Sequence, residues 1–90
     1  MVYVDTMRAT FGRMVMAHMI ADTHDELIAM ADKIGVDVKW IQRRGHAYEH
    51  FDITLGRKKL AIQFGAKEIT QREMLKIINA KKRMSIVPDL

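Results

Sequence analysis

Five ionisable residues lie on or at the ends of segments whose sequence predicts β-strands. They are Asp5, His18, Asp22, His50 and Asp52. Histidine and aspartate side chains placed in this way can bind a metal, relay a proton or hold a phosphate. In open α/β sheets, ligands collect beyond the carboxyl ends of the strands, beside helix amino termini. We therefore expect Asp5 and Asp22 to project into one site at a rim of the sheet.

His50 and Asp52 are two residues apart in a β-prone run, so their side chains face the same side of the strand. Phe51 and Ile53 would face the other side, into the core. A pair of this kind suits metal binding, proton relay or phosphate binding. We expect this pair and His18 to share one rim with the strand ends.

Each of these residues also has a purely structural interpretation. His18 inside an apolar strand can be a core histidine that is bonded to its neighbours. Asp22 can help to cap the helix that follows it. His50 and Asp52 can pair with each other or with nearby backbone, and Asp5 at a strand end can form a turn. The sequence alone leaves both interpretations open.

The strand and helix between residues 13 and 35 would position the first part of the site. The apolar run from Met14 to Ala21 predicts a strand, and since it is apolar on both faces we place it in the middle of the sheet. Thr23 and Glu26 form a capping box. Apolar residues at helical spacing follow and predict a helix that ends at Gly35.

The other segments also alternate between strands and helices. Strands are predicted at 2–5, 36–42, 50–53 and 67–69, a loop at 6–12 and a basic turn at 43–45. Helices are predicted after the caps Thr54 and Thr70. The residues expected to face inward from these helices are Leu60, Ala61, Phe64, Met74, Ile77 and Ile78.

This succession predicts an α/β or α+β fold: a small mixed, partly parallel sheet with about three helices packed on it. We expect residues 1–90 to form a single domain in which 84–90 are a tail, because Pro88 keeps that segment out of a further helix.

The composition narrows the class of protein. Hydrophobic residues make up 49% of the chain and charged residues 29%, which is typical of a soluble globular domain. The chain has no cysteine, which excludes disulfides, thiolate zinc sites and cysteine nucleophiles. No apolar run approaches the roughly 18 residues of a membrane span. We expect a cytoplasmic protein without a membrane partner, and a homo-oligomer is a reasonable expectation for so small a domain.

One literal motif is rejected. His46 to His50 matches H-x-x-E-H, the inverted zinc-protease pattern, which requires both histidines on one helical face. Gly45 precedes this stretch and a β-prone run follows it, so a helix is not expected.

The basic residues gather at 43–44, 57–59 and 81–83, and the net charge is +4. These basic residues would form a nucleic-acid binding surface only if the fold brought them to one face with aromatic residues between them. The alternative for each group is a solvated surface.

Several short stretches, taken in their order and spacing, resemble the domain-of-unknown-function 4031 family. They are V-Y-V-D at 2–5, G-R at 12–13, A-H-M-I-A-D at 17–22, D-E-L at 25–27, I-G at 34–35, H-F-D-I at 50–53, G-A at 65–66 and R-E-M at 72–74. The resemblance covers about residues 2–78. It implies a small phage or bacterial protein, and some members are joined to an HD-type phosphohydrolase domain, which hints at nucleotide or phosphate-ester chemistry.

The family pattern also has polar residues at several positions of the candidate site. These positions are Asp5, His18, Asp22, His50, Asp52 and Arg72. The resemblance implies no reaction, because the family has none to carry over.

The leading interpretation is a small binding module for a phosphorylated ligand, a nucleotide or nucleotide signal, in a phage- or prophage-associated protein. We expect a binding protein rather than an enzyme. The sequence does not identify a cofactor, and no residue is assigned as a metal ligand. If the protein is phage-encoded, it would act in the host cytoplasm. The ligand-binding residues would be Asp5, Arg8, Arg13, His18, Asp22, His50, Asp52 and Arg72.

Two other functions remain open. The first is an interaction factor that binds nucleic acid or a host protein through its positive surface. The second is a metal-dependent phosphoester hydrolase that uses Asp5, His18, His50 and Asp52 as ligands or general bases. The weakness of the hydrolase interpretation is the lack of a glutamate or a further histidine to complete a divalent site.

Overall fold

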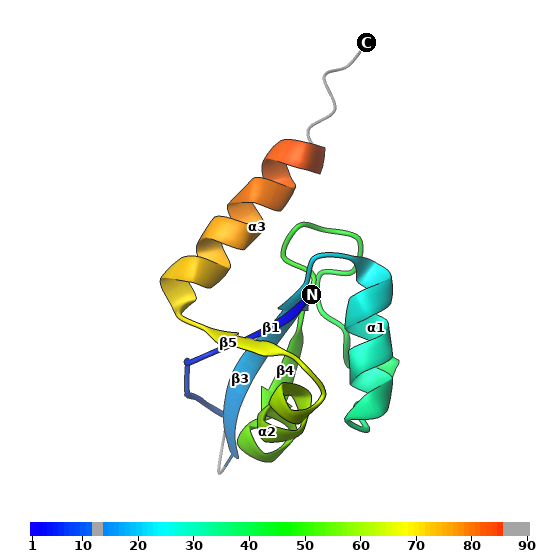
Figure 1. The fold of residues 1–90 in the computed structure, drawn as a ribbon, viewed down its shortest axis with the longest axis vertical. Helices are drawn as coiled ribbons and strands as arrows, with labels where there is room; N and C mark the ends of the chain where they lie inside the picture. Colours follow the sequence, from blue (N-terminus) through cyan, green and yellow to red (C-terminus); the bar gives the residue numbers. More distant parts are fainter. Residues whose placement is uncertain (12–13, 86–90) are drawn as a thin grey trace.

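The computed structural model describes residues 1–11 and 14–85 of the chain. The elements are β1 (Val2–Asp5), β2 (Ala9–Phe11), β3 (Met14–Ala21), α1 (His24–Lys33), the 3₁₀ helix η1 (Val38–Trp40), β4 (Phe51–Thr54), α2 (Leu55–Gln63), β5 (Lys67–Ile69) and α3 (Gln71–Ser85). Figure 1 shows α3 running from the end of β5 toward the carboxyl terminus, and α1 and α2 both contribute to one apolar core. The architecture is α+β with a mixed sheet, as the sequence predicts.

β3 is the central strand of the sheet. Met19 pairs with Val4 of β1 and also with Phe51 of β4, so β1 and β4 lie on opposite edges of β3. β2 pairs with the first part of β3, on the edge that β1 continues. All these pairings are antiparallel, whereas β5 joins β1 in parallel. The predicted central strand and partly parallel sheet are confirmed.

The two faces of the sheet carry separate apolar cores. On one face, Met19 packs with Phe51, Ile53 and the buried side of α1. On the other face, Ile20 packs with residues of β5 and α3, and Ile69 is among them. Because side chains alternate along a strand, neighbouring residues of β3 and β4 belong to different faces. The face toward α3 is the one that carries the polar residues described below.

The predicted caps begin all three α-helices. Thr23 accepts a hydrogen bond from the backbone N–H of Glu26 at the start of α1, and Thr54 accepts one from Arg57 at the start of α2. Thr70 and Glu73 bond reciprocally at the start of α3. Gly35 has φ +76° just after α1, a conformation that glycine adopts without strain.

Two segments differ from the sequence-based expectations. Residues 9–11 form β2 rather than a loop, because the edge of β3 offers them backbone partners that hydrophobic periodicity does not reveal. Residues 36–42 form η1 and a single bridge between Gln42 and His50 rather than a strand. Asp37 accepts a hydrogen bond from the backbone N–H of Lys39, and this local bond favours a turn over an extended strand.

The inward faces of the last two helices are predicted unequally well. Met74 and Ile78 of α3 are buried as expected, whereas α2 buries only Ala61 and leaves Leu60 and Phe64 exposed. Ala61 packs in the core, whereas Leu60, one residue earlier, lies on a different side of α2, and Phe64 lies at its carboxyl-terminal cap. α3 continues to Ser85, so the first two residues of the predicted tail are helical, and the rest of the tail lies outside the described residues.

Within residues 1–11 and 14–85, none of the helices combines the length and apolar character that a membrane crossing requires.

Candidate functional site

Three adjacent strands place acidic and histidine side chains in a row on the α3 face of the sheet. His18 of β3 is the direct partner of Asp52 of β4. On the other edge of β3, Asp5 ends β1 and binds His18 twice. Its Oδ2 lies 2.8 Å from the ring Nδ1, and its Oδ1 accepts a hydrogen bond of 2.9 Å from the backbone N–H. Strand pairing alone therefore brings together residues that are distant in sequence.

His50 enters the same group from the start of β4, two residues before Asp52. Its Nδ1 lies 2.8 Å from the carbonyl oxygen of Tyr48. A carbonyl oxygen only accepts hydrogen bonds, so Nδ1 carries the proton and Nε2 of the neutral ring carries the lone pair. The carboxylate of Asp5 fixes His18 in the same tautomer.

The two free nitrogens converge on one carboxylate oxygen. Nε2 of His18 and Nε2 of His50 each lie 3.6 Å from Oδ1 of Asp52. Within the part of the chain that the structure describes, these three ligand atoms all lie within 4.8 Å of one another. Two ligands about 2.1 Å from a common metal ion are about 3 to 4 Å apart. The two separations of 3.6 Å fall in this range, which suits the binding of one small cation.

The surroundings hold these side chains in place. Gln42 donates a hydrogen bond of 2.5 Å from Nε2 to Oδ2 of Asp52, which leaves Oδ1 of Asp52 for the group. The rings of Tyr48 and His50 stack with their centroids 4.3 Å apart. Asp5 is 1% exposed, whereas the side chains of His18 and Asp52 are 18% and 19% exposed. Hydrogen bonds and ring stacking thus hold the side chains of the site, while His18 and Asp52 stay partly exposed to solvent.

The electrostatics follow from this packing. The hydrogen bond that the His18 ring donates to Asp5 raises the pKa of His18 above 6.5, burial lowers it, and the charges of Asp5 and Asp52 add to the rise. Burial also raises the pKa of Tyr48, and the negative charges of Asp52 and Asp5 add to that rise. The site therefore favours positive charge at its centre.

Two pockets flank the row of side chains. One, of about 440 Å³, reaches Asp52, Gln42 and Trp40. The other, of about 410 Å³, lies beside α3 and reaches Asp5 and His18. Both are large enough for a small organic ligand.

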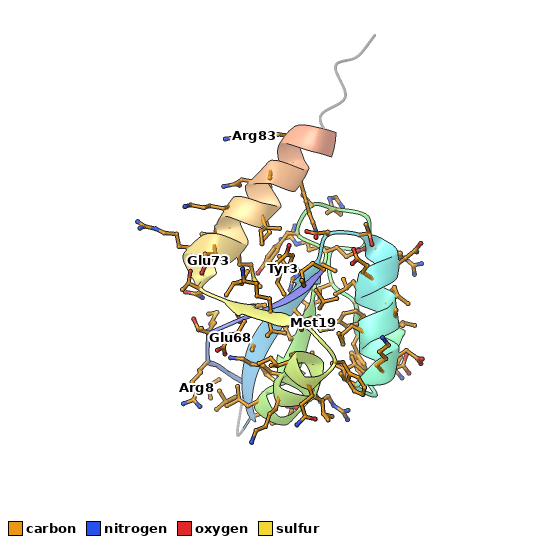
Figure 2. All side chains as sticks on the ribbon, in the orientation of Figure 1. Tyr3, Arg8, Met19, Glu68, Glu73 and Arg83 are labelled. Carbon is orange, nitrogen blue, oxygen red and sulfur yellow. The ribbon has the colours of Figure 1, made fainter. Side chains whose placement is uncertain are left out.

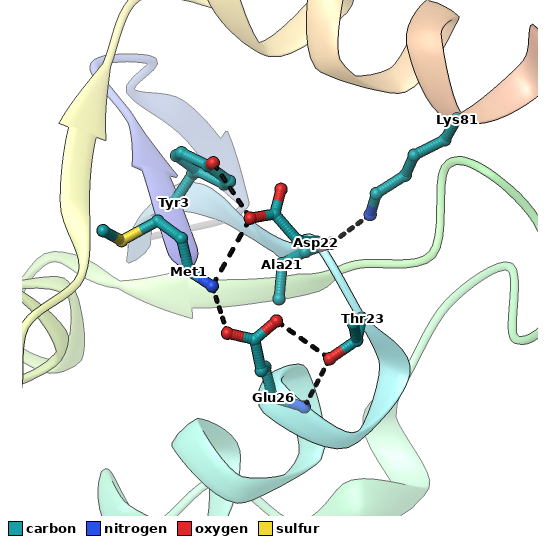
Figure 3. A network of polar contacts seen from close by, with 7 residues as sticks. All are labelled: Met1, Tyr3, Ala21, Asp22, Thr23, Glu26 and Lys81. Carbon is teal, nitrogen blue, oxygen red and sulfur yellow. Dashed lines mark hydrogen bonds and ion pairs between the residues drawn. The ribbon is translucent and has the colours of Figure 1, made fainter. Parts of the chain in front are cut away.

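The other residues of the predicted site lie elsewhere. Asp22 accepts a hydrogen bond from the hydroxyl of Tyr3 and pairs with the amino group of Met1, as Figure 3 shows. The expectation that Asp5 and Asp22 share a rim is wrong, because β1 and β3 are antiparallel and their carboxyl ends lie at opposite ends of the sheet.

The predicted arginines do not join the cluster where the structure describes them. Arg8 is exposed and projects outward from the segment between β1 and β2 (Figure 2). Arg72 is exposed in the first turn of α3. Arg13 lies outside the described residues.

Two members of the site were not singled out from the sequence. Tyr48 lies in the turn before β4, so the alternation of strand side chains gives no signal for it in the sequence. Gln42 has no such signal either, because its place depends on the bridge to His50 across a long loop.

The segment of the rejected H-x-x-E-H motif forms a turn, not a helix. Its Glu49 has another role. This carboxylate lies 2.8 Å from Nδ1 of His24 and accepts a 3.0 Å hydrogen bond from the backbone N–H of Gly45, so it fastens the loop to α1.

Comparison with known proteins gives a family without a known activity. Neither the curated proteins nor the solved structures contain a match to this chain. The model of one protein family, described as "Protein of unknown function (DUF4031)", matches residues 2–81. The chain therefore belongs to the DUF4031 family.

Proposed function

We propose that this protein is a metal-dependent hydrolase of phosphate esters, and that His18, His50 and Asp52 bind one divalent cation. The observation that carries the proposal is the convergence of two Nε2 atoms on Oδ1 of Asp52, each at 3.6 Å. Two nitrogen lone pairs around a carboxylate oxygen become a favourable arrangement when a cation lies between them.

The outer contacts support the same assignment. Histidines that bind metals commonly donate their second ring nitrogen to a carboxylate or a backbone carbonyl, which fixes ring and tautomer. His18 has such a contact with Asp5, and His50 with the carbonyl of Tyr48. Two histidines and one carboxylate are a ligand set found in catalytic zinc and iron sites, where the remaining coordination positions stay open.

The chemistry requires little beyond the ion and its positioning. A divalent cation polarises a phosphoryl oxygen and lowers the pKa of a coordinated water. Overall, the water oxygen bonds to phosphorus and the bond between phosphorus and the ester oxygen breaks. The departing alcohol takes one proton of the water, and the phosphate product or the solvent takes the other. The role of Asp5, Tyr48 and Gln42 is to keep the ligands in position.

Metal titration and turnover of model esters test this function. Protein freed of metal with EDTA is titrated with Zn²⁺ and Mn²⁺ by calorimetry, and is then assayed with p-nitrophenyl phosphate and bis-p-nitrophenyl phosphate. We expect one ion per chain and metal-dependent turnover, both lost in His50→Gln. The matched control is His46→Gln, which changes an exposed histidine and should preserve both.

Two results would contradict the proposal. Wild-type protein that binds the ion no better than His50→Gln would remove the metal site. Protein that binds the ion and phosphorylated ligands but cleaves no ester would be the binding module favoured by the sequence, not a hydrolase.

A further inference from the structure

The pocket beside Asp52 differs in its lining from the pocket beside α3. It lies on the same face of the sheet as the proposed ion, where Met16 of β3 is paired with Thr54 of β4. That pair is two residues along the strands from His18 and Asp52, a distance of about 7 Å. Because Asp52 both borders the pocket and belongs to the proposed metal site, a molecule bound to the ion would extend into the pocket.

An aromatic ring stands at this pocket. Trp40 ends η1, borders the pocket and is 65% exposed, although indole is among the least favourable side chains to leave in water. Nζ of Lys39 lies 5.3 Å from the centroid of the Trp40 ring and adds positive charge nearby. An exposed indole is a stacking surface for a flat ring, and any of the nucleobases can stack on it because each has a π-face.

A positioned arginine also borders the pocket. Arg57 donates a hydrogen bond from Nη1 to the carbonyl oxygen of Ile34, and this bond holds the guanidinium. A guanidinium has five N–H groups, so the bond to Ile34 leaves several that can bind phosphate oxygens. The same pocket therefore presents an aromatic surface, a fixed positive group and an edge of the proposed metal site.

We propose that the substrate is a nucleoside phosphate whose base stacks on Trp40 and whose phosphate lies between Arg57 and the ion. The inference rests on the proposed function, because it takes the ion to be held by His18, His50 and Asp52. The volume of about 440 Å³ is within the range of pockets that hold ligands of this size.

The pocket beside α3 is the competing location for the base. Its lining, within the described residues, includes Leu75 and Tyr48 but no lysine or arginine. It also reaches the proposed ion through His18, but it offers a phosphate no basic side chain that would play the part of Arg57. A variant in this pocket, Leu75→Ala, is therefore the matched control for variants of Trp40.

The sequence contains one tryptophan, so its fluorescence reports on this pocket directly. Protein loaded with Zn²⁺ is titrated with AMP and, separately, with ribose 5-phosphate, which carries the phosphate and sugar without the base. We expect AMP to quench the emission of Trp40 saturably and to bind about tenfold or more tightly than ribose 5-phosphate, given what one stacked base contributes.

Calorimetry on variants gives the second measurement. We expect Trp40→Ala to lose about tenfold or more of the affinity for AMP and little of that for ribose 5-phosphate, and Trp40→Phe to retain most of both. Arg57→Gln should weaken both ligands, and Leu75→Ala neither. Equal affinities for the two ligands, or a loss of AMP affinity in Leu75→Ala but not in Trp40→Ala, would overturn the inference.

The two proposals fail in different ways. AMP bound at Trp40 but never cleaved would leave this pocket assignment standing and remove the hydrolase. Metal-dependent cleavage of AMP and ribose 5-phosphate with equal kcat/KM, unchanged in Trp40→Ala, would leave the hydrolase standing and remove the nucleoside site.

Discussion

Asp52 of β4 lies directly across from His18 of β3, and its Oδ1 is 3.6 Å from Nε2 of that histidine. The contact is too long for a hydrogen bond and is the separation expected of two ligands of one ion. The pairing of β3 with β4 brings these two residues together although 33 residues lie between them in the sequence.

Removing the charge of this carboxylate tests its role as a ligand. We expect Asp52→Asn to lower the affinity for Zn²⁺ by about tenfold or more, because an amide oxygen is a weaker ligand than a carboxylate. Competition with a coloured chelator measures the affinity. Asp25→Asn, which changes an exposed carboxylate in the first turn of α1, is the control. Equal losses in the two variants would show that only overall charge matters.

Asp5 is expected to act through His18 rather than on the ion itself. In Asp5→Asn the side-chain oxygen can still accept from the backbone N–H of His18, but the carboxylate on Nδ1 is lost. We expect the affinity for Zn²⁺ to fall about 10- to 100-fold. Thermal unfolding without metal separates this effect from a loss of folding. Unchanged affinity in a folded variant would exclude a positioning role.

The core face of β4 can be tested without touching the site. Ile53 is 1% exposed and packs in the core beneath α1 and α2. We expect Ile53→Val to lower the free energy of unfolding by about 0.5 to 1.5 kcal/mol. Urea denaturation gives this value, and the affinity for Zn²⁺ should stay that of wild type. A changed affinity would mean that the two faces of the strand are coupled.

Much of the fold follows from local sequence. The apolar stretch that became β3 and the threonine caps of the helices are signals carried by neighbouring residues, and the structure confirms them. Residues 9–11 carry no comparable signal, since their strand depends on the free edge of β3. Leu60 and Phe64 were misplaced because periodicity gives the spacing of an apolar stripe, while tertiary packing decides which side is buried.

The candidate site was predictable in part. Spacing alone put His50 and Asp52 on one face, and the structure does so. The link to Asp22 failed because it assumed parallel strands, and strand direction is set by long-range pairing. The partial alternation of residues 36–42 predicts a strand that carries Gln42 and Trp40, whereas the structure places Trp40 in η1 and Gln42 at a single bridge to His50.

The capping box of α3 gives a stability that depends on pH. Hydrogen bonds from the backbone and hydroxyl of Thr70 lower the pKa of Glu73 below 4.5, so this contribution is present above that value and is lost as the pH falls through the lowered pKa. We expect Thr70→Ala to lower the free energy of unfolding by about 1 kcal/mol near neutral pH. The difference from wild type should shrink at pH about 3, measured by urea denaturation. A constant difference would exclude a pH-dependent contribution from the hydroxyl bond between Thr70 and Glu73.

A half-buried lysine should give a dependence in the same direction, but at higher pH. Nζ of Lys81 donates to the carbonyl oxygen of Ala21 (Figure 3). Burial lowers the pKa of Lys81 below 10.5, against the charges of Asp22, Glu49 and Glu26. Between the lowered pKa and 10.5 the unfolded chain binds more protons than the folded one, so stability rises with pH.

Lys81→Met tests this dependence. Wild type should gain stability relative to Lys81→Met as the pH rises from neutral to about 10, and chemical denaturation across that range measures it. The control is Lys76→Met, which changes an exposed lysine of α3. Curves that run parallel for wild type and Lys81→Met would mean that Lys81 titrates alike in both states.

Side chains alternate between the two faces of β4, so neighbouring residues of this strand have different surroundings. Phe51 and Ile53 are buried in the core, while Asp52 and Thr54 line the pocket beside Trp40. Every second position is thus open to redesign for a new specificity, provided that the intervening apolar residues are left alone. The same alternation makes the proposed site sensitive to an insertion: one added residue before Phe51 would turn the Asp52 carboxylate toward the apolar core and the Phe51 ring toward water.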